Sequence, residues 1–209
     1  MFGIQHFEMF LAAGILLNLT PGSDTLYILG RSISQGKRAG IYSVLGISSG
    51  ITVHTLLAAL GLSAILATSA EAFMLVKLLG ALYLGYLGIT TLFARNNPLL
   101  PQSGGCLSPR EIFLQGLLTN VLNPKVALFF LSFLPQFIAP SNPYGLLPFL
   151  ILGTTFFITG TLWCLLLVLF SSGMTGFLRA NPRMADRLNR FCGVIYLGLG
   201  VKLALAEQY

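Results

Sequence analysis

Apolar residues occur along the chain in six long runs that are separated by short polar stretches. The runs cover Phe7 to Gly30, Gly40 to Thr68, Ala72 to Ala94, Ile112 to Ala139, Tyr144 to Met174 and Leu188 to Ala206. Each run is long enough for an α-helix that crosses a bilayer, which needs about 20 residues. The pattern therefore predicts an all-α integral membrane protein with six transmembrane helices.

The composition agrees with this class and narrows the function. Only 9% of the residues are charged and 55% are hydrophobic, whereas soluble domains average about 25% charged residues. Six spans leave no room in 209 residues for a sizeable soluble domain, so we expect a single transmembrane domain over residues 1–209. The paired acids, Ser/Lys or Ser/His arrangement, or HExxH motif of an intramembrane hydrolase are not found, and we do not expect an enzyme.

Positive charge is distributed unevenly between the loops. Nine of the twelve Lys and Arg residues lie in or beside the first, third and fifth loops: Arg31, Lys37, Arg38, Arg95, Arg110, Arg179, Arg183, Arg187 and Arg190. By the positive-inside rule these loops are cytoplasmic and both termini face outward. The net charge of +6 is thus explained by the orientation of the protein in the lipid bilayer. Nucleic acid is not an expected partner.

The two halves of the chain resemble each other. Span three contains Lys77-Leu-Leu-Gly-Ala-Leu-Tyr-Leu-Gly85, and span six contains Arg190-Phe-Cys-Gly-Val-Ile-Tyr-Leu-Gly198. Leu19-Thr-Pro21 in span one likewise corresponds to Leu122-Asn-Pro124 in span four. We interpret residues 1–94 and 111–209 as repeats joined by a linker over 95–110, which ends in the capping box Ser108-Pro-Arg-Glu111. Because three spans are an odd number, the repeats must be inverted, as in many transporters.

Each of these motifs places a capping side chain before a proline inside a span. The first is Thr20-Pro21-Gly22-Ser23-Asp24 and the second is Asn123-Pro124-Lys125. A proline removes one backbone N–H and crowds the preceding turn, so we expect helices 1 and 4 to be kinked or broken at Pro21 and Pro124. A half-helix that begins there presents free N–H groups to an anion. The alternative is that both prolines only bend their helices.

Several polar side chains lie close to these motifs. Asp24 and Lys125 each cost about 2.5–3.5 kcal/mol to place in a membrane, which favours a substrate or ion path, although a structural ion pair is the alternative. Asn18 and Asn120 add polar groups to the same stretches, and His54 is either a proton relay or a packing residue. Trp163 and the 16 Phe residues are interpreted as packing.

No cofactor or metal site is expected from the remaining residues. Cys106, Cys164 and Cys192 are far apart and form no CxxC pair. Gly46-x-x-x-Gly50 fits close helix packing but is too common to predict a dimer. A homo-oligomer therefore stays open at this point.

Taken in order, the motifs resemble the lysine exporter superfamily, and more closely its homoserine/threonine (RhtB-type) efflux branch. The resemblance covers essentially the whole chain and is carried by Asn18-Leu-Thr-Pro-Gly-Ser-Asp-Thr-Leu26, Gly30-Arg-Ser32, Gly36-Lys-Arg-Ala-Gly40, Gly46, Gly80-Ala-Leu-Tyr-Leu-Gly-Tyr-Leu-Gly88, Leu117-Leu-Thr-Asn-Val-Leu-Asn-Pro-Lys125 and Leu134-Pro-Gln-Phe137. Ser23 departs from it, since many relatives have a second proline there, and some relatives lack an acid at position 24.

The resemblance implies a secondary carrier in the bacterial inner membrane that exports small amino acids, with H⁺ as the coupling ion. In this picture the substrate carboxylate lies at the half-helix ends after Pro21 and Pro124, assisted by Lys125. Asp24 holds the ammonium group or the coupling proton, and His54 is the second candidate for coupling. The alternative cargo is a divalent metal or another small ion, because members of the wider superfamily move metals.

Overall fold

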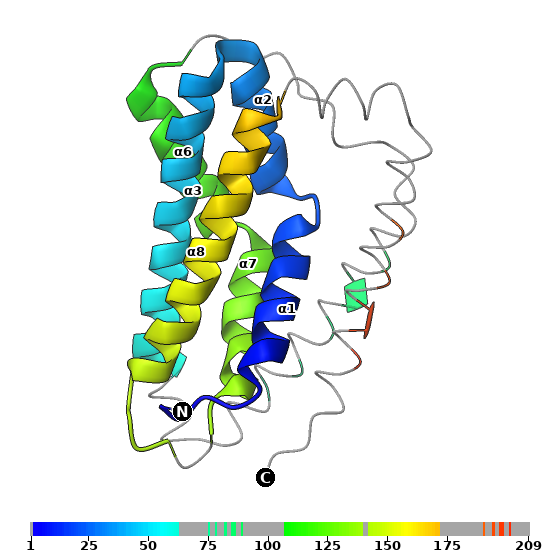
Figure 1. Ribbon diagram of the computed structural model, residues 1–209, viewed down its shortest axis with the longest axis vertical. Helices are drawn as coiled ribbons and strands as arrows, with labels where there is room; N and C mark the ends of the chain where they lie inside the picture. The colour runs from blue at the N-terminus through cyan, green and yellow to red at the C-terminus, as the bar shows by residue number, and fades with distance from the viewer. Residues whose placement is uncertain are drawn as a thin grey trace.

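The computed structural model describes residues 2–62, 107–139 and 142–171, together with single positions at 75, 78, 82, 85, 86, 89, 190, 194, 197, 198 and 201. The described segments fold as helices joined by short connections (Figure 1). The motif matches of spans three and six, most of the linker and the fifth loop fall outside the segments described continuously. The expected six-helix inverted repeat therefore stays a prediction.

The described helices follow the predicted apolar runs but are interrupted inside two of them. Their bounds are α1 Phe7–Leu19, α2 Ser23–Gln35, α3 Lys37–Leu57, α6 Pro109–Val121, α7 Pro124–Leu128 and α8 Leu147–Leu169, with π-helical turns η1 Ala58–Leu62 and η2 Phe129–Phe133 and the 3₁₀ turn η3 Leu134–Phe137. Within these segments, Lys37–Gly61 and Leu147–Leu169 are each long and apolar enough to cross a membrane. The pair Pro109–Val121 and Pro124–Phe137 passes the same criterion as one bent span.

Both predicted breaks are present. The first helix ends at Leu19 and resumes at Ser23. The helix of the fourth run ends at Val121, resumes at Pro124 and bends by 46° between its two parts. The prediction that these helices are interrupted at the two prolines is therefore confirmed.

The two broken helices lie side by side and run in opposite directions. The Gln5 N–H donates to the Phe137 carbonyl at 2.8 Å, which joins the start of α1 to the end of η3. At the other end the Gln35 side chain donates to the Leu107 carbonyl at 2.9 Å, which joins the end of α2 to the segment before α6. Figure 1 shows the result, with α1 beside α7 in one half of the molecule and α2 near α6 in the other.

Glycines allow α3 and α6 to approach closely. A Cβ atom at Gly46 would collide with the backbone of Phe113, and one at Gly116 would lie 2.9 Å from the Ser43 carbonyl oxygen. Gly50 leaves the room that the Asn120 side chain occupies. The close packing expected of Gly46-x-x-x-Gly50 is thus confirmed, and within the described structure it serves to place α6 and Asn120.

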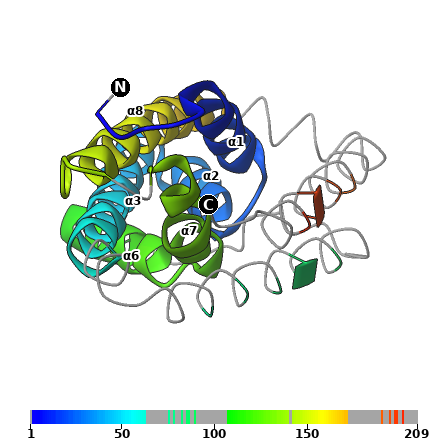
Figure 2. The ribbon, with the colours of Figure 1, turned by 90° about the horizontal axis from the view of Figure 1, so that it is seen from below.

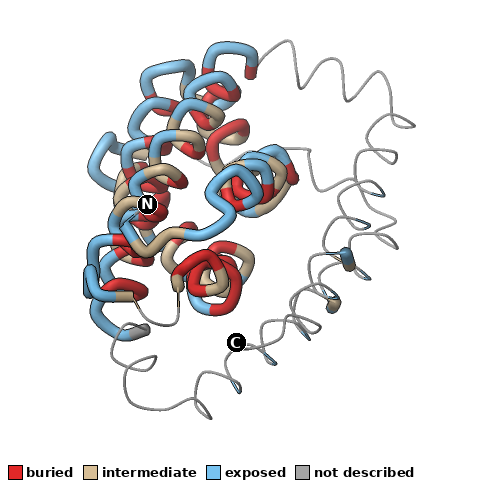
Figure 3. Tube along the Cα trace, turned by 60° about the horizontal axis from the view of Figure 1, so that its bottom comes forward, coloured by how far each residue is buried: buried red, intermediate tan, exposed pale blue. Residues whose placement is uncertain are grey.

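The buried apolar residues form two clusters, one around each half of the bundle. The first is rich in phenylalanine and includes Phe10, Phe129, Phe130, Phe133 and Phe156, with the rings of Phe129 and Phe156 4.7 Å apart. The second joins α2, α3 and α8. Figure 3 shows the buried positions facing inward between the helices, and Figure 2 shows α7 lying between α1, α3, α6 and α8. The packing role expected of the phenylalanines is confirmed for these residues.

Candidate functional site

The first break leaves α2 without a side-chain cap. Gly22 is the residue before α2 and has no side chain that could accept from the first N–H groups of that helix. Thr20 instead turns back to α1, where its hydroxyl donates to the Leu16 carbonyl at 2.7 Å. The first turn of α2 therefore offers N–H groups and the positive end of the helix dipole to a ligand.

Lys125 contacts the other side of the first break, at the end of α1. Its ammonium group donates to the carbonyl oxygens of Leu17 at 3.2 Å and Thr20 at 3.0 Å. Leu17 lies in the last turn of α1 and its carbonyl also accepts from the Thr20 N–H at 3.2 Å, whereas Thr20 follows the helix, which has no further turn to satisfy the Thr20 carbonyl. The negative end of the α1 dipole favours a cation at this place. The lysine of the second motif thus stabilises the break of the first.

The second break is capped on one side by its own Asn123 and on the other by His54 of α3. Asn123 is the residue before α7, and its side-chain oxygen accepts from the Lys125 N–H at 3.0 Å. At the preceding end, the Asn120 carbonyl is 3.1 Å from Nε2 of His54. Because a carbonyl only accepts, Nε2 carries the proton in this contact. One side chain therefore caps each side of this break.

Asp24 and Lys125 have different partners. The Asp24 carboxylate accepts from the Asn120 side-chain amide at 2.8 Å and faces the hydroxyl of Ser23 at 3.4 Å, whereas the Lys125 ammonium group contacts the α1 carbonyls. Asn120 is fully buried and Asp24 is half-buried. An acidic group and a basic group thus lie beside the same break.

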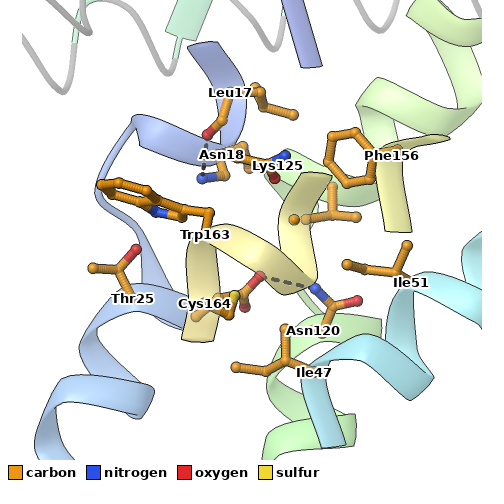
Figure 4. A pocket seen from close by; sticks show the side chains of 13 residues that line it. Leu17, Asn18, Thr25, Ile47, Ile51, Asn120, Lys125, Phe156, Trp163 and Cys164 are labelled. Atoms are coloured by element: carbon orange, nitrogen blue, oxygen red, sulfur yellow. Dashed lines mark hydrogen bonds between the residues drawn. The ribbon is translucent and has the colours of Figure 1, made fainter. Parts of the chain in front are cut away.

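A small cavity lies between the two broken helices, α3 and α8 (Figure 4). Its polar lining includes Asn18, Asp24, Asn120 and Lys125, and Asn18 also donates to the Thr159 hydroxyl of α8 at 3.3 Å. Its apolar lining comes from both core clusters: Leu17, Ile47, Ile51, Val126 and Phe156. An amphipathic cavity of this kind suits a small ligand with charged groups at one end and an apolar side chain at the other.

The cavity is small in this conformation. Its volume is about 20 Å³, and about 10–15 Å³ is enough for one water molecule. An amino acid does not fit into this space. The helices around the cavity must therefore separate before a solute of that size can enter or leave.

The structure brings together part of the predicted site. Asn18, Asp24, Asn120 and Lys125 line the cavity, while Thr20, Pro21, Gly22 and Ser23 form the adjacent break. Asn123, Pro124 and His54 are not among the lining residues. The sequence analysis missed the wall that α8 contributes, which consists of Phe156, Gly160, Trp163 and Cys164. Trp163 had been interpreted as packing, and its being the only tryptophan in the chain is the one signal that singles it out.

The described residues offer no metal centre. Across residues 2–62, 107–139 and 142–171, no group of three or more His, Cys, Asp or Glu side chains could hold a metal ion. The acid at the cavity is already engaged by an amide. No observation in this part of the chain favours a metal cargo.

Comparisons with known proteins agree with a membrane transporter. The model of the LysE type translocator family matches residues 15–207. The chain is 30% identical over 200 residues to the uncharacterized membrane protein YrhP of Bacillus subtilis, covering 91% of this chain and 94% of the relative. It is 29% identical over 212 residues to the leucine efflux protein of Salmonella typhimurium, covering 99% and 98%. An uncharacterized membrane protein of Pseudomonas aeruginosa is 31% identical over 209 residues, covering 98% and 97%. No solved structure matches the chain.

Proposed function

The chain belongs to the family of LysE type translocators, and from this membership we propose that it exports neutral amino acids with aliphatic side chains from the bacterial cytoplasm. Relatives that align over nearly the whole chain are named leucine efflux proteins, which supports a substrate of this kind. The proposal narrows the wider class of small amino acids to those with an apolar side chain.

The observation that carries the proposal is the amphipathic cavity between the broken helices. A neutral amino acid has one cationic group, one anionic group and an apolar side chain. The cavity offers a carboxylate at Asp24, a helix start at Ser23 and an apolar wall from Ile47, Ile51 and Phe156. Each part of the substrate thus has a chemically matched group within one small volume.

We assign the ammonium group of the substrate to Asp24 and its carboxylate to the first turn of α2. Gly22 leaves that turn uncapped, and an added Cβ at Gly22 would be only 3.2 Å from the Lys125 ammonium nitrogen, so a positive charge lies beside the same turn. The α7 turn is less suitable, because the Asn123 side chain already accepts from one of its N–H groups. The proposal therefore favours the first half-helix over the second.

Energy coupling is proposed to use protons. A carboxylate that holds the substrate ammonium group can release it when a proton takes its place, so Asp24 would bind substrate and proton in turn. His54 reaches the Asn120 backbone at 3.1 Å, and Asn120 binds Asp24 at 2.8 Å. We therefore assign His54 to the alignment of Asn120 and keep Asp24 as the coupling group.

Transport is proposed to proceed by alternating access in an inverted repeat. The antiparallel course of the two broken helices supports such a repeat, since inverted halves place equivalent helices in opposite directions. Separate hydrogen bonds join the two broken helices at opposite ends of the bundle, one from Gln5 to Phe137 and one from Gln35 to Leu107. Separation of the helices at one end at a time would expose the cavity to one side of the membrane.

The proposed location is the bacterial inner membrane, with cytoplasmic first, third and fifth loops and both termini outside. To test the orientation, single cysteines replace Lys37 or Pro143, both exposed, in a cysteine-free background. An impermeant thiol reagent applied to intact cells is expected to label Pro143→Cys and spare Lys37→Cys. The reverse pattern would overturn the orientation.

The export activity is tested with cells that are loaded with a library of dipeptides. Leucine and other aliphatic amino acids are expected to accumulate in cells that lack the protein and to appear in the medium when it is restored. Cells that produce Asp24→Asn at the same level serve as the matched control. An identical amino-acid profile with and without the protein would contradict the proposed function.

A further inference from the structure

Trp163 carries a polar group that the described structure leaves without a partner. Its indole nitrogen is buried and makes no hydrogen bond. A buried tryptophan N–H normally finds an acceptor, because an unmade hydrogen bond at an enclosed donor is costly. The indole N–H is a donor only, so the missing partner must be an acceptor such as a carboxylate oxygen.

The position of Trp163 is what connects this donor to the cavity. The residue lies on α8 and lines the cavity together with Asp24, Thr25 and Lys125. In Figure 4 its ring lies above Thr25, near the ribbon that connects α1 and α2. The residue with the unpaired donor therefore lines the same cavity as two residues of the first turns of α2, Asp24 and Thr25.

Other unpaired polar atoms of the described residues do not fit this role. Ser32 and Asn123 each have one, but neither residue lines the cavity. The unpaired side-chain oxygen of Asn120 would be 2.6 Å from a Cβ atom added at Gly50. This oxygen therefore faces α3. Trp163 thus combines an unpaired donor with a place in the cavity wall.

We propose that the indole N–H of Trp163 binds an oxygen of the substrate α-carboxylate and makes Trp163 a specificity-determining residue for free amino acids. The inference rests on the proposed function, in which Asp24 holds the ammonium group. The two contacts come from different helices that line the cavity, Trp163 on α8 and Asp24 on α2. Together they select a solute that carries both charges next to each other.

The test uses the full-length protein in proteoliposomes and measures exchange of radiolabelled leucine. Trp163→Phe removes the N–H and keeps an aromatic ring. A second variant carries 3-benzothienylalanine at position 163, which replaces only the N–H by sulfur and keeps the indole shape. We expect both variants to raise the KM for leucine about tenfold or more, the usual effect of losing a hydrogen bond to a charged group.

3-Methylbutylamine has the ammonium group and the side chain of leucine but no oxygen that could accept a hydrogen bond, so it distinguishes the loss of the hydrogen bond from a change of cavity shape. Its inhibition constant against leucine exchange is expected to be the same in both variants as in the unmodified protein. An unchanged KM for leucine, or an equal loss for leucine and 3-methylbutylamine, would overturn the assignment. Absence of any amino-acid exchange by the unmodified protein would instead overturn the proposed function, and the assignment with it.

Discussion

The two helix breaks carry similar sequences but are stabilised in different ways. The second break supplies its own helix cap, since the Asn123 side chain caps α7, while His54 of α3 reaches the carbonyl of Asn120 on the other side. The first break has no cap of its own on α2, and the carbonyls at the end of α1 are contacted by Lys125 from the second motif. The symmetric motifs therefore have unequal roles, in which the second break supports the first.

This difference bears on where a ligand binds. At a capped helix start, a side chain already accepts from one of the first N–H groups. At an uncapped helix start, all of these N–H groups stay available to a ligand. The described structure also places the acid, Asp24, in the first turn of the uncapped helix. We therefore propose a single substrate site at the first break rather than two equivalent half-sites.

The largest effect is expected from Asp24→Asn. The variant is expected to insert normally, because the neutral side chain removes a charge that is costly in the membrane. Leucine export against a gradient is expected to fall by roughly 100-fold, as when one partner of a buried charge pair is removed. Export from loaded cells is the measurement, with Glu8→Gln, an exposed acid, as the matched control.

The double variant Asp24→Asn/Lys125→Met tests whether the loss of export comes only from an unpaired charge. Lys125 contacts carbonyl groups of the first break, whereas Asp24 is proposed to bind the substrate ammonium group, so removing both charges is not expected to restore export. Recovery of uphill export in the double variant would mean that the two residues form only a structural pair.

Lys125→Met is expected to destabilise the protein by about 1–3 kcal/mol, because the Thr20 carbonyl loses its side-chain donor and the Leu17 carbonyl keeps only the Thr20 N–H. Thermal unfolding of the detergent-solubilised protein measures the loss. Lys37→Met, at an exposed position, controls for the change of charge and is expected to unfold like the unmodified protein. Equal stability of the two variants would show that Lys125 does not support the first break.

The smallest effect is expected from Asn123→Ala. The variant loses the cap of α7, which is worth about 1 kcal/mol, and its KM for leucine is expected to stay near that of the unmodified protein. Asn123→Asp keeps an acceptor at the same place and is expected to recover the stability. A large rise in KM for Asn123→Ala would place substrate at the second break as well.

The sequence predicts the features that depend on near neighbours in the chain. Proline after a capping residue marks both breaks, and the capping box at the start of α6 is formed, with the Ser108 N–H donating to Glu111 at 2.8 Å. The spacing of Gly46 and Gly50 correctly indicates close helix packing. Each of these signals arises within about four residues, where local sterics and hydrogen bonding decide the outcome.

The missed features are contacts between residues that are distant in sequence. Lys125 contacts carbonyl oxygens of residues more than 100 positions earlier, and no local pattern predicts that contact. Trp163 lies in an apolar helix with no polar stripe, so periodicity gives no reason to place it in a cavity. Which face of α8 meets the breaks is decided by tertiary packing, for which a single sequence has no local signal.

Equilibrium binding of radiolabelled leucine to the purified protein tests the central claim most directly, because it compares the two breaks without depending on transport. Asp24→Asn and Asn123→Ala are measured beside the unmodified protein under identical conditions. The account predicts that Asp24→Asn raises the Kd by roughly 100-fold, while Asn123→Ala leaves it within about threefold, since a cap that binds no substrate changes stability and not affinity. Equal weakening by the two substitutions, or a stronger effect of Asn123→Ala, would contradict a single site at the first break.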